Sequence, residues 1–348
     1  MGNGKVEMGV KAAVRAAILW LCLAAPATFA GALEDGQSAY EQKDYANALR
    51  LWRPLAEQGD AAAQNNLGEM YSAGYGVPKD DAQAISWYRK AADQGFSPAQ
   101  FSLGFMYSLG HGLPKDDIQA TYWYLKAAEK GDSSAQISLR LSCLSDQGVS
   151  QDVMKWCHKS AEQGDASAQT ILGSKYRDGQ DVPQDFAQAA NWFRRAAMQG
   201  DAIAQLNLGA MYNQGRGVPQ DYTQAAAWYR MAAAQGQSGA QSLLGSLYNL
   251  GQGVPQDDVQ AAGWYRMAAQ QGNVTAQYFL GVLYDMGRGV PQDYVQGHLW
   301  YNLAAAQSST ANGDFTKLAV EKRDIIAAKM TPGQIAEAQR LAREWKPN

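Results

Sequence analysis

Histidine, cysteine and serine motifs decide whether this sequence supports metal or nucleophilic chemistry. The three histidines, His111, His158 and His298, are far apart, and no H-x-x-x-H or paired-cysteine spacing occurs, so the sequence predicts no metal site. A G-x-S-x-G turn with a nucleophilic serine is also absent. The recurring G-x-G-V-P segments do not stand between a strand and a helix, as a phosphate-binding loop would. We therefore predict no catalytic residue, no metal and no cofactor.

Length and charge narrow the class of protein further. The 348 residues are 46% apolar and 18% charged, with 30 Lys and Arg against 33 Asp and Glu. This apolar content is enough to bury a core, while the net charge of −3 offers no basic surface for nucleic acid. We expect no membrane span in the mature chain, because only one long apolar stretch occurs, at the N-terminus.

The first thirty residues have the features of a secretory signal peptide. Three basic residues precede an apolar run over 16–25, which Pro26 ends before the small residues around Ala30 and Ala32. The run is shorter than the roughly 20 residues that a membrane span needs. We expect cleavage after Ala30 or Ala32, and Cys22 then leaves with the signal. The sequence thus predicts export to the periplasm of a Gram-negative bacterium, with secretion beyond the cell as the second choice.

A 36-residue pattern repeats along the rest of the chain. Tryptophan recurs at intervals of 36 residues, with one interval of 33, and an Ala-Gln pair, a Leu-Gly pair and a loop proline recur in phase with it. A repeat of this length with helical spacing of apolar residues is typical of solenoids. The tryptophans are Trp87, Trp123, Trp156, Trp192, Trp228, Trp264 and Trp300.

Residues 201–236 illustrate the fold expected for one unit. Asp201 is a suitable N-cap for a first helix whose apolar residues are spaced four apart. Asp221 caps a second helix after a glycine-rich turn. Gly209 of the first helix has no side chain, so we expect Trp228 of the second helix to lie against it. The repeated aromatic residues are therefore interpreted as core.

The units resemble the Sel1-like repeat family, a branch of the tetratricopeptide-like α-solenoids. The motifs that carry the resemblance are A-x-x-x-L-G-x-x-Y, G-x-G-V-P-x-D and A-x-x-W-Y-x-x-A-A-x-x-G, which recur from about residue 60 to 307. The resemblance implies an all-α, right-handed superhelical solenoid of stacked antiparallel helix hairpins that binds proteins or peptides.

The pattern divides the chain into four parts. Residues 1–30 are the signal peptide, and 31–59 are an N-terminal tetratricopeptide-like capping hairpin with its turn at Lys43-Asp44. Residues 308–348 are C-terminal capping helices, the last of which begins in a capping box at Thr331. The seven repeats between them are predicted at 60–95, 96–131, 132–164, 165–200, 201–236, 237–272 and 273–307.

The third unit, 132–164, departs from the pattern. It is three residues shorter, has Arg140 where the other units have glycine, and places Cys143 and Cys157 where the first unit has tyrosine. In an oxidising compartment these cysteines are expected to pair, which adds up to about 3 kcal/mol of stability. The alternative is two buried free thiols that fill the same space. Cysteine-rich members of the family also bridge helices, at other motif positions.

In the family, first helices line the inner, concave face of the solenoid, and here their outer positions vary between units. Large apolar residues gather at these positions in the second and third units, which predicts a partner-binding patch. The alternative is that the irregular third unit covers the two phenylalanines. The predicted partner-binding residues are Phe101, Phe105, Ile137, Leu141, Leu144, Arg177 and Tyr278.

These features predict an exported, non-enzymatic scaffold or adaptor that binds a protein or peptide partner on its concave face, in envelope signalling or assembly. Two alternatives stay open: an envelope hydrolase or β-lactam-binding protein of the same fold, and a self-assembling structural protein. Some members of the family have been labelled β-lactamases or penicillin binders. The S-x-x-K and K-T-G motifs of that chemistry are absent from this sequence.

Overall fold

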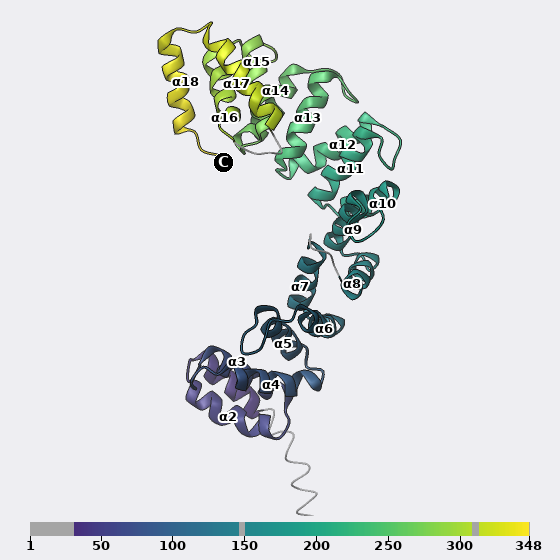
Figure 1. Cartoon of the computed structure of the whole chain (residues 1–348), viewed down its shortest axis with the longest axis vertical. Helices are drawn as coiled ribbons and strands as arrows, with labels where there is room; N and C mark the ends of the chain where they lie inside the picture. The colour runs from purple at the N-terminus through teal and green to yellow at the C-terminus, as the bar shows by residue number, and fades with distance from the viewer. Residues whose placement is uncertain (1–30, 146–149, 308–312, 348) are drawn as a thin grey trace, which may run out of the picture. The chain divides into compact units, whose positions relative to one another are not determined.

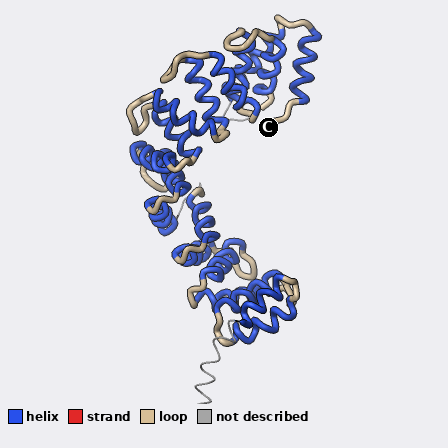
Figure 2. Tube along the Cα trace, turned by 180° about the vertical axis from the view of Figure 1, so that it is seen from behind, coloured by secondary structure: helices blue, strands red, loops and turns tan. Residues whose placement is uncertain are grey.

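The computed structural model describes residues 31–145, 150–307 and 313–347. All regular elements in these ranges are helices, joined by short loops (Figure 2). They form two compact units, which divide within one helix, between Trp156 and Cys157. The predicted signal peptide and Cys22 lie outside the described residues. The predicted all-α stack of antiparallel hairpins is confirmed within each unit.

Unit 1 begins with the N-terminal hairpin. A helix over residues 31–41 pairs with α2 (Tyr45–Glu57), and Lys43 in the turn between them has a φ of 63°. Trp52 is buried inside this hairpin. The helices that follow are α3 (Ala61–Ala73), α4 (Asp81–Asp93), α5 (Ser97–Leu109), α6 (Asp117–Glu129) and α7 (Ser133–Cys143), and the unit boundary falls within α8 (Gln151–Glu162).

Unit 2 contains four regular repeats followed by two closing helices (Figure 1). The last helix begins with the predicted capping box, in which the side chains and backbones of Thr331 and Gln334 exchange hydrogen bonds. The helices are α9 (Ala166–Asp178), α10 (Phe186–Met198), α11 (Ala202–Gln214), α12 (Tyr222–Ala234), α13 (Ser238–Leu250), α14 (Asp258–Gln270), α15 (Val274–Met286), α16 (Tyr294–Ala305), α17 (Gly313–Ala327) and α18 (Pro332–Glu344).

Aspartate and glycine set the ends of the repeat helices. Asp201 accepts a hydrogen bond from the backbone N–H of Ala204 at 2.7 Å, and Asp221 caps α12 in the same way. Gly215 ends α11 in the left-handed conformation, with a φ of 68°. Both predicted caps are confirmed, and they satisfy helix-end groups that would otherwise lack partners.

A glycine of the first helix lies against an aromatic ring of the second helix in every regular repeat. A Cβ atom on Gly209 would lie only 2.7 Å from Cδ1 of Tyr229. The prediction that Trp228 lies there is wrong, because Trp228 packs instead against the cluster that α10 and α11 form. The corresponding pairs are Gly68 with Tyr88, Gly104 with Tyr124, Gly173 with Phe193, Gly245 with Tyr265 and Gly281 with Tyr301.

Buried glutamines join consecutive repeats. In the Ala-Gln pair of each regular repeat, Nε2 of the glutamine donates to the carbonyl oxygen of an alanine eight residues earlier, at the end of the preceding repeat, as Gln205 does to Ala197 at 3.1 Å. Its Oε1 accepts from a glutamine thirty residues later, as Gln205 does from Gln235 at 2.9 Å. The buried glutamines are Gln64, Gln100, Gln169, Gln205, Gln241 and Gln277.

Gln100 is the exception among these glutamines. Its Nε2 donates to the carbonyl oxygen of Ala92 at 3.0 Å, but its buried Oε1 has no hydrogen-bond partner among the described residues. The residue thirty positions later is Lys130, where the other repeats supply glutamine. The missing bond therefore follows from one change of residue type.

The same Gly→Ala change is expected to have opposite effects at two helix positions. In Gly209→Ala the new methyl meets Tyr229, and overpacking costs about 1–3 kcal/mol, so the free energy of unfolding falls. In Gly263→Ala the methyl meets no atom within 4 Å, and better helix propensity raises the free energy of unfolding by about 0.5–1 kcal/mol. Urea unfolding followed by circular dichroism measures both changes, and shifts of the same sign would contradict the packing described.

Lys130→Gln is expected to stabilise unit 1. The new amide supplies a donor for the buried Oε1 of Gln100, and a net hydrogen bond of this kind is worth about 1 kcal/mol. The matched control is Lys317→Gln, an exposed position on α17, where we expect a change within about 0.5 kcal/mol. Equal urea midpoints for the two variants would show that the orphaned oxygen carries no penalty.

Candidate interaction surfaces

Five of the seven predicted partner-binding residues lie in unit 1, on α5, on α7 and, for Leu144, directly after the end of α7. Phe105, Ile137 and Leu141 are 46, 51 and 64% exposed, although they are large and apolar. Leu109 is also exposed, one helical turn beyond Phe105. It was not among the predicted residues, although its spacing of four is the signal that would have found it. We refer to Phe101, Phe105, Leu109, Ile137, Leu141 and Leu144 as the apolar ridge.

Phe101 anchors the ridge. Its ring lies 5.7 Å from that of Tyr124 in the same hairpin and stacks on Phe105 at 6.2 Å, centroid to centroid. Phe101 is half-buried as a result. Phe105, in contrast, is 46% exposed. The alternative in which the third unit covers both phenylalanines is therefore wrong for Phe105.

Tyr278 does not belong to an open surface. It is 8% exposed, and its ring lies 5.6 Å from that of Phe315 on α17. Ala319 and Ile326 of α17 are fully buried in the same cluster. The prediction that Tyr278 contacts a partner is wrong, because a closing helix of the chain itself covers this face of α15.

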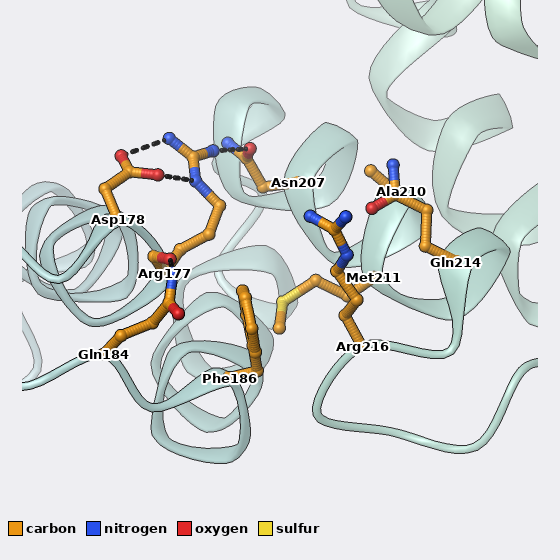
Figure 3. Close-up of a pocket in the computed structure, with 9 residues that line it drawn as sticks. All are labelled: Arg177, Asp178, Gln184, Phe186, Asn207, Ala210, Met211, Gln214 and Arg216. Atoms are coloured by element: carbon orange, nitrogen blue, oxygen red, sulfur yellow. Dashed lines mark hydrogen bonds and ion pairs between the residues drawn. The ribbon is translucent and has the colours of Figure 1, made fainter.

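Arg177 lines a pocket of about 410 Å³ in unit 2, between the hairpin of α9 and α10 and the next first helix, α11 (Figure 3). Its guanidinium donates to both carboxylate oxygens of Asp178 at 2.8 and 2.7 Å and also to Oδ1 of Asn207. The hydrogen bonds between the two side chains raise the pKa of Arg177 and lower that of Asp178. Both groups are therefore charged at neutral pH, and Arg177 is held in one orientation.

Arg216 supplies a second guanidinium to the same pocket. It lies 5.6 Å from the ring centroid of Phe186, a cation–π contact. Among the described residues its guanidinium makes no hydrogen bond or ion pair, and Figure 3 shows none to the residues drawn. Arg216 was not predicted as a site residue, because an arginine in an exposed loop has no distinctive spacing.

The two cysteines of the third repeat are buried. Cys143 is 1% and Cys157 0% exposed, and each is disulfide-bonded. The sequence has a third cysteine, Cys22, which lies outside the described residues. That Cys143 and Cys157 are bonded to each other therefore stays a prediction.

The histidines have separate environments. His158 meets the ring of Tyr176 edge to face. Burial lowers the pKa of His298, and its Nδ1 has no partner in the part of the chain that the structure describes. Within those residues, no group of three or more His, Cys, Asp or Glu is placed to hold a metal ion. None of the described helices is both long enough and apolar enough to cross a membrane.

Stacked helix hairpins with a variable first-helix face define a repeat protein of the solenoid class. A family model described as Sel1 repeat matches most of the chain, and the chain belongs to the Sel1 repeat family. Only a short match falls in the irregular third repeat, whereas the N-terminal hairpin, which was predicted to be tetratricopeptide-like, is matched in full. The matched residues are 30–60, 61–96, 97–132, 154–165, 166–201, 202–237, 238–273 and 274–309.

Solved structures of other Sel1 repeat proteins resemble the chain. A Sel1 repeat protein from Oxalobacter formigenes is 34% identical over 83% of this chain and 87% of its own, with a TM-score of 0.63. The protective antigen c5321 of uropathogenic Escherichia coli is 29% identical over 91% of both chains, with a TM-score of 0.45. No curated protein matches the chain. Sel1 repeat proteins are generally protein-interaction scaffolds and are typically non-enzymatic.

Proposed function

We propose that the protein is an exported, non-enzymatic scaffold that binds a helical segment of a partner protein on the apolar ridge. The observation that carries the proposal is the exposure of Phe105, Ile137, Leu141 and Leu144, each between 46 and 64%. Groups of exposed large apolar residues are typical of protein interfaces, where a few large side chains supply most of the binding energy.

The fold itself does not require apolar residues at these positions. Phe101 and Ile137 are 36 residues apart, as are Phe105 and Leu141, so the pairs occupy the same register in successive repeats. Three other first helices have small or polar residues in this register, whereas α11 has a leucine and an alanine there. The residues are Asn65 and Glu69 on α3, Thr170 and Ser174 on α9, Leu206 and Ala210 on α11, and Ser242 and Ser246 on α13.

The chain also contains an example of what fits such a face. On α15 the same register holds Tyr278 and Val282, and α17 packs over them through Phe315 and its neighbours. An amphipathic helix is therefore the partner chemistry that this repeat surface accepts. On α5 and α7 the apolar residues remain exposed, which favours a helix from another protein as their partner.

Binding without catalysis is also the reading that the sequence favours. The motifs of β-lactam chemistry are missing from the sequence, and the family is typically non-enzymatic. Residues 1–30 support the proposed export, and a role in envelope signalling or assembly is proposed with it. The first test below also distinguishes binding of a partner protein from self-assembly through the ridge.

A Phe105→Asp/Leu141→Asp variant of residues 31–348 is expected to lose its partner. Affinity capture from envelope extracts should retain one partner on the wild type and about tenfold less of it on the variant, because two charges replace the centre of the ridge. The variant should stay folded and lose at most about 1.5 kcal/mol of its free energy of unfolding, since Leu141 is largely exposed and Phe105 gives up only its ring contact with Phe101.

The matched control is Ile118→Asp, which changes an 81% exposed residue on the second helix α6 and should capture as the wild type does. Identical partner lists for all three proteins would refute the ridge as the site. A wild-type mass that rises with concentration, and does not rise in the double variant, would favour self-assembly instead.

Export of the protein and oxidation of its cysteines are tested together by measuring the mass of the intact, unfolded protein after alkylation of free thiols. When the full chain is expressed in a Gram-negative host, we expect a periplasmic protein that begins at Gly31 or Leu33. Its unfolded form should contain no thiol that reacts, because Cys143 and Cys157 pair in an oxidising compartment. Retention of the first thirty residues in the cytoplasm would refute export, and two alkylated thiols in the periplasmic protein would refute the disulfide.

A further inference from the structure

We propose that the pocket around Arg216 binds a carboxylate group of a peptide, either an acidic side chain or a free C-terminus. A guanidinium presents paired N–H donors that match the two oxygens of a carboxylate. Arg216 keeps these donors unused among the described residues, and it faces a pocket whose volume of about 410 Å³ lies in the range of small-ligand sites.

Another repeat of the chain shows which group an arginine at the loop position of Arg216 binds. Arg288 occupies the same place two repeats later, 72 residues from Arg216. Its Nε and Nη2 donate to the two carboxylate oxygens of Asp258 at 2.9 and 3.0 Å. Arginine at this position thus forms a bidentate pair with a carboxylate at the start of the second helix of the preceding repeat.

Around Arg216 the chain does not supply that carboxylate. The position equivalent to Asp258 is Phe186, whose ring lies beside the guanidinium. In the repeat between them the two positions are Tyr222 and Gln252, so neither charge is present there. Arg216 is therefore the member of this series whose guanidinium is left for an external carboxylate.

The rest of the pocket favours a peptide monoanion. Arg177 is already paired with Asp178, so Arg216 supplies the net positive charge, and the carboxylate of Asp178 disfavours a dianion such as phosphate. Met211 and Phe186 add apolar surface, and the amide of Gln214 is available for a backbone hydrogen bond. Figure 3 shows these side chains around the same space.

The proposal does not depend on the apolar ridge, because every residue in it belongs to unit 2. The probes are three pentapeptides: AAEAA and AAQAA with both ends blocked, and AAAAA with a free C-terminus. Inorganic phosphate is the fourth probe. Titration is followed by NMR of the arginine Nε–Hε signals in residues 31–348. We expect a saturable shift of the Arg216 signal with AAEAA or with the free C-terminus, and the stronger of the two identifies the source of the carboxylate.

Two variants should weaken or prevent binding in different ways. Arg216→Gln installs the residue that Gln252 already places in the same register, and we expect about tenfold weaker binding. Phe186→Asp keeps Arg216 but supplies an internal carboxylate, as Asp258 does for Arg288, and should also prevent binding. The matched control Arg288→Gln should bind within about twofold of the wild type.

Three results would overturn the proposal. The first is no shift with either carboxylate probe up to about 10 mM, and the second is equal binding of AAQAA or tighter binding of phosphate. The third is a loss in Arg288→Gln as large as that in Arg216→Gln. The Phe105→Asp/Leu141→Asp variant should bind the peptides normally, so failure of the ridge proposal and failure of this one are distinguishable.

Discussion

The buried glutamine amide is the interaction on which the stacking of repeats depends. The last carbonyl groups of each second helix have a local backbone donor, as Ala197 has in the N–H of Gly200 at 3.0 Å. The glutamine of the next repeat donates to the same carbonyl and so joins the two repeats. A buried amide oxygen is costly to leave unsatisfied, and in all regular repeats except that of Gln100 the oxygen of the glutamine accepts from a glutamine thirty residues later. This requirement holds one face of each first helix constant. The opposite face is free to change, so binding surfaces can vary there without disturbing the stack.

The third repeat shows that the repeat contacts change as coupled sets. In regular repeats an arginine of the second helix donates to a tyrosine hydroxyl of the next first helix, as Arg89 does to Tyr107 at 3.0 Å. One repeat later the same two positions hold Leu125 and Cys143. The glycine and tyrosine of the helix-packing pair are likewise replaced by Arg140 and Cys157. Each cysteine thus stands where an aromatic residue makes a standard contact in the regular repeats, and the residue that the aromatic side chain contacts has changed with it.

Local chemistry was predictable from the sequence, and non-local contacts were not. The caps at Asp201 and Asp221 were predicted because each depends on a few adjacent residues. The choice between Trp228 and Tyr229 as the ring against Gly209 was wrong, since two adjacent aromatic residues fit the helical period almost equally well. The error at Tyr278 has a different origin, because α17 follows the repeats and no periodicity places it. Arg216 was missed because its significance appears only by comparison with Arg288.

The two proposed surfaces follow the same physical logic. Where the register places apolar residues on α15, the chain supplies α17 to cover them, and where it places Arg288 in a loop, the chain supplies Asp258. The apolar ridge is in the same register as these residues of α15, and Arg216 is in the same register as Arg288. For both, the described residues supply no covering helix or carboxylate. A repeat protein contains several copies of each local environment, so a satisfied copy indicates the chemistry that an unsatisfied copy requires. Because the recurring glutamine and glycine contacts do not involve these exposed positions, an unsatisfied copy costs little stability and stays available for a partner.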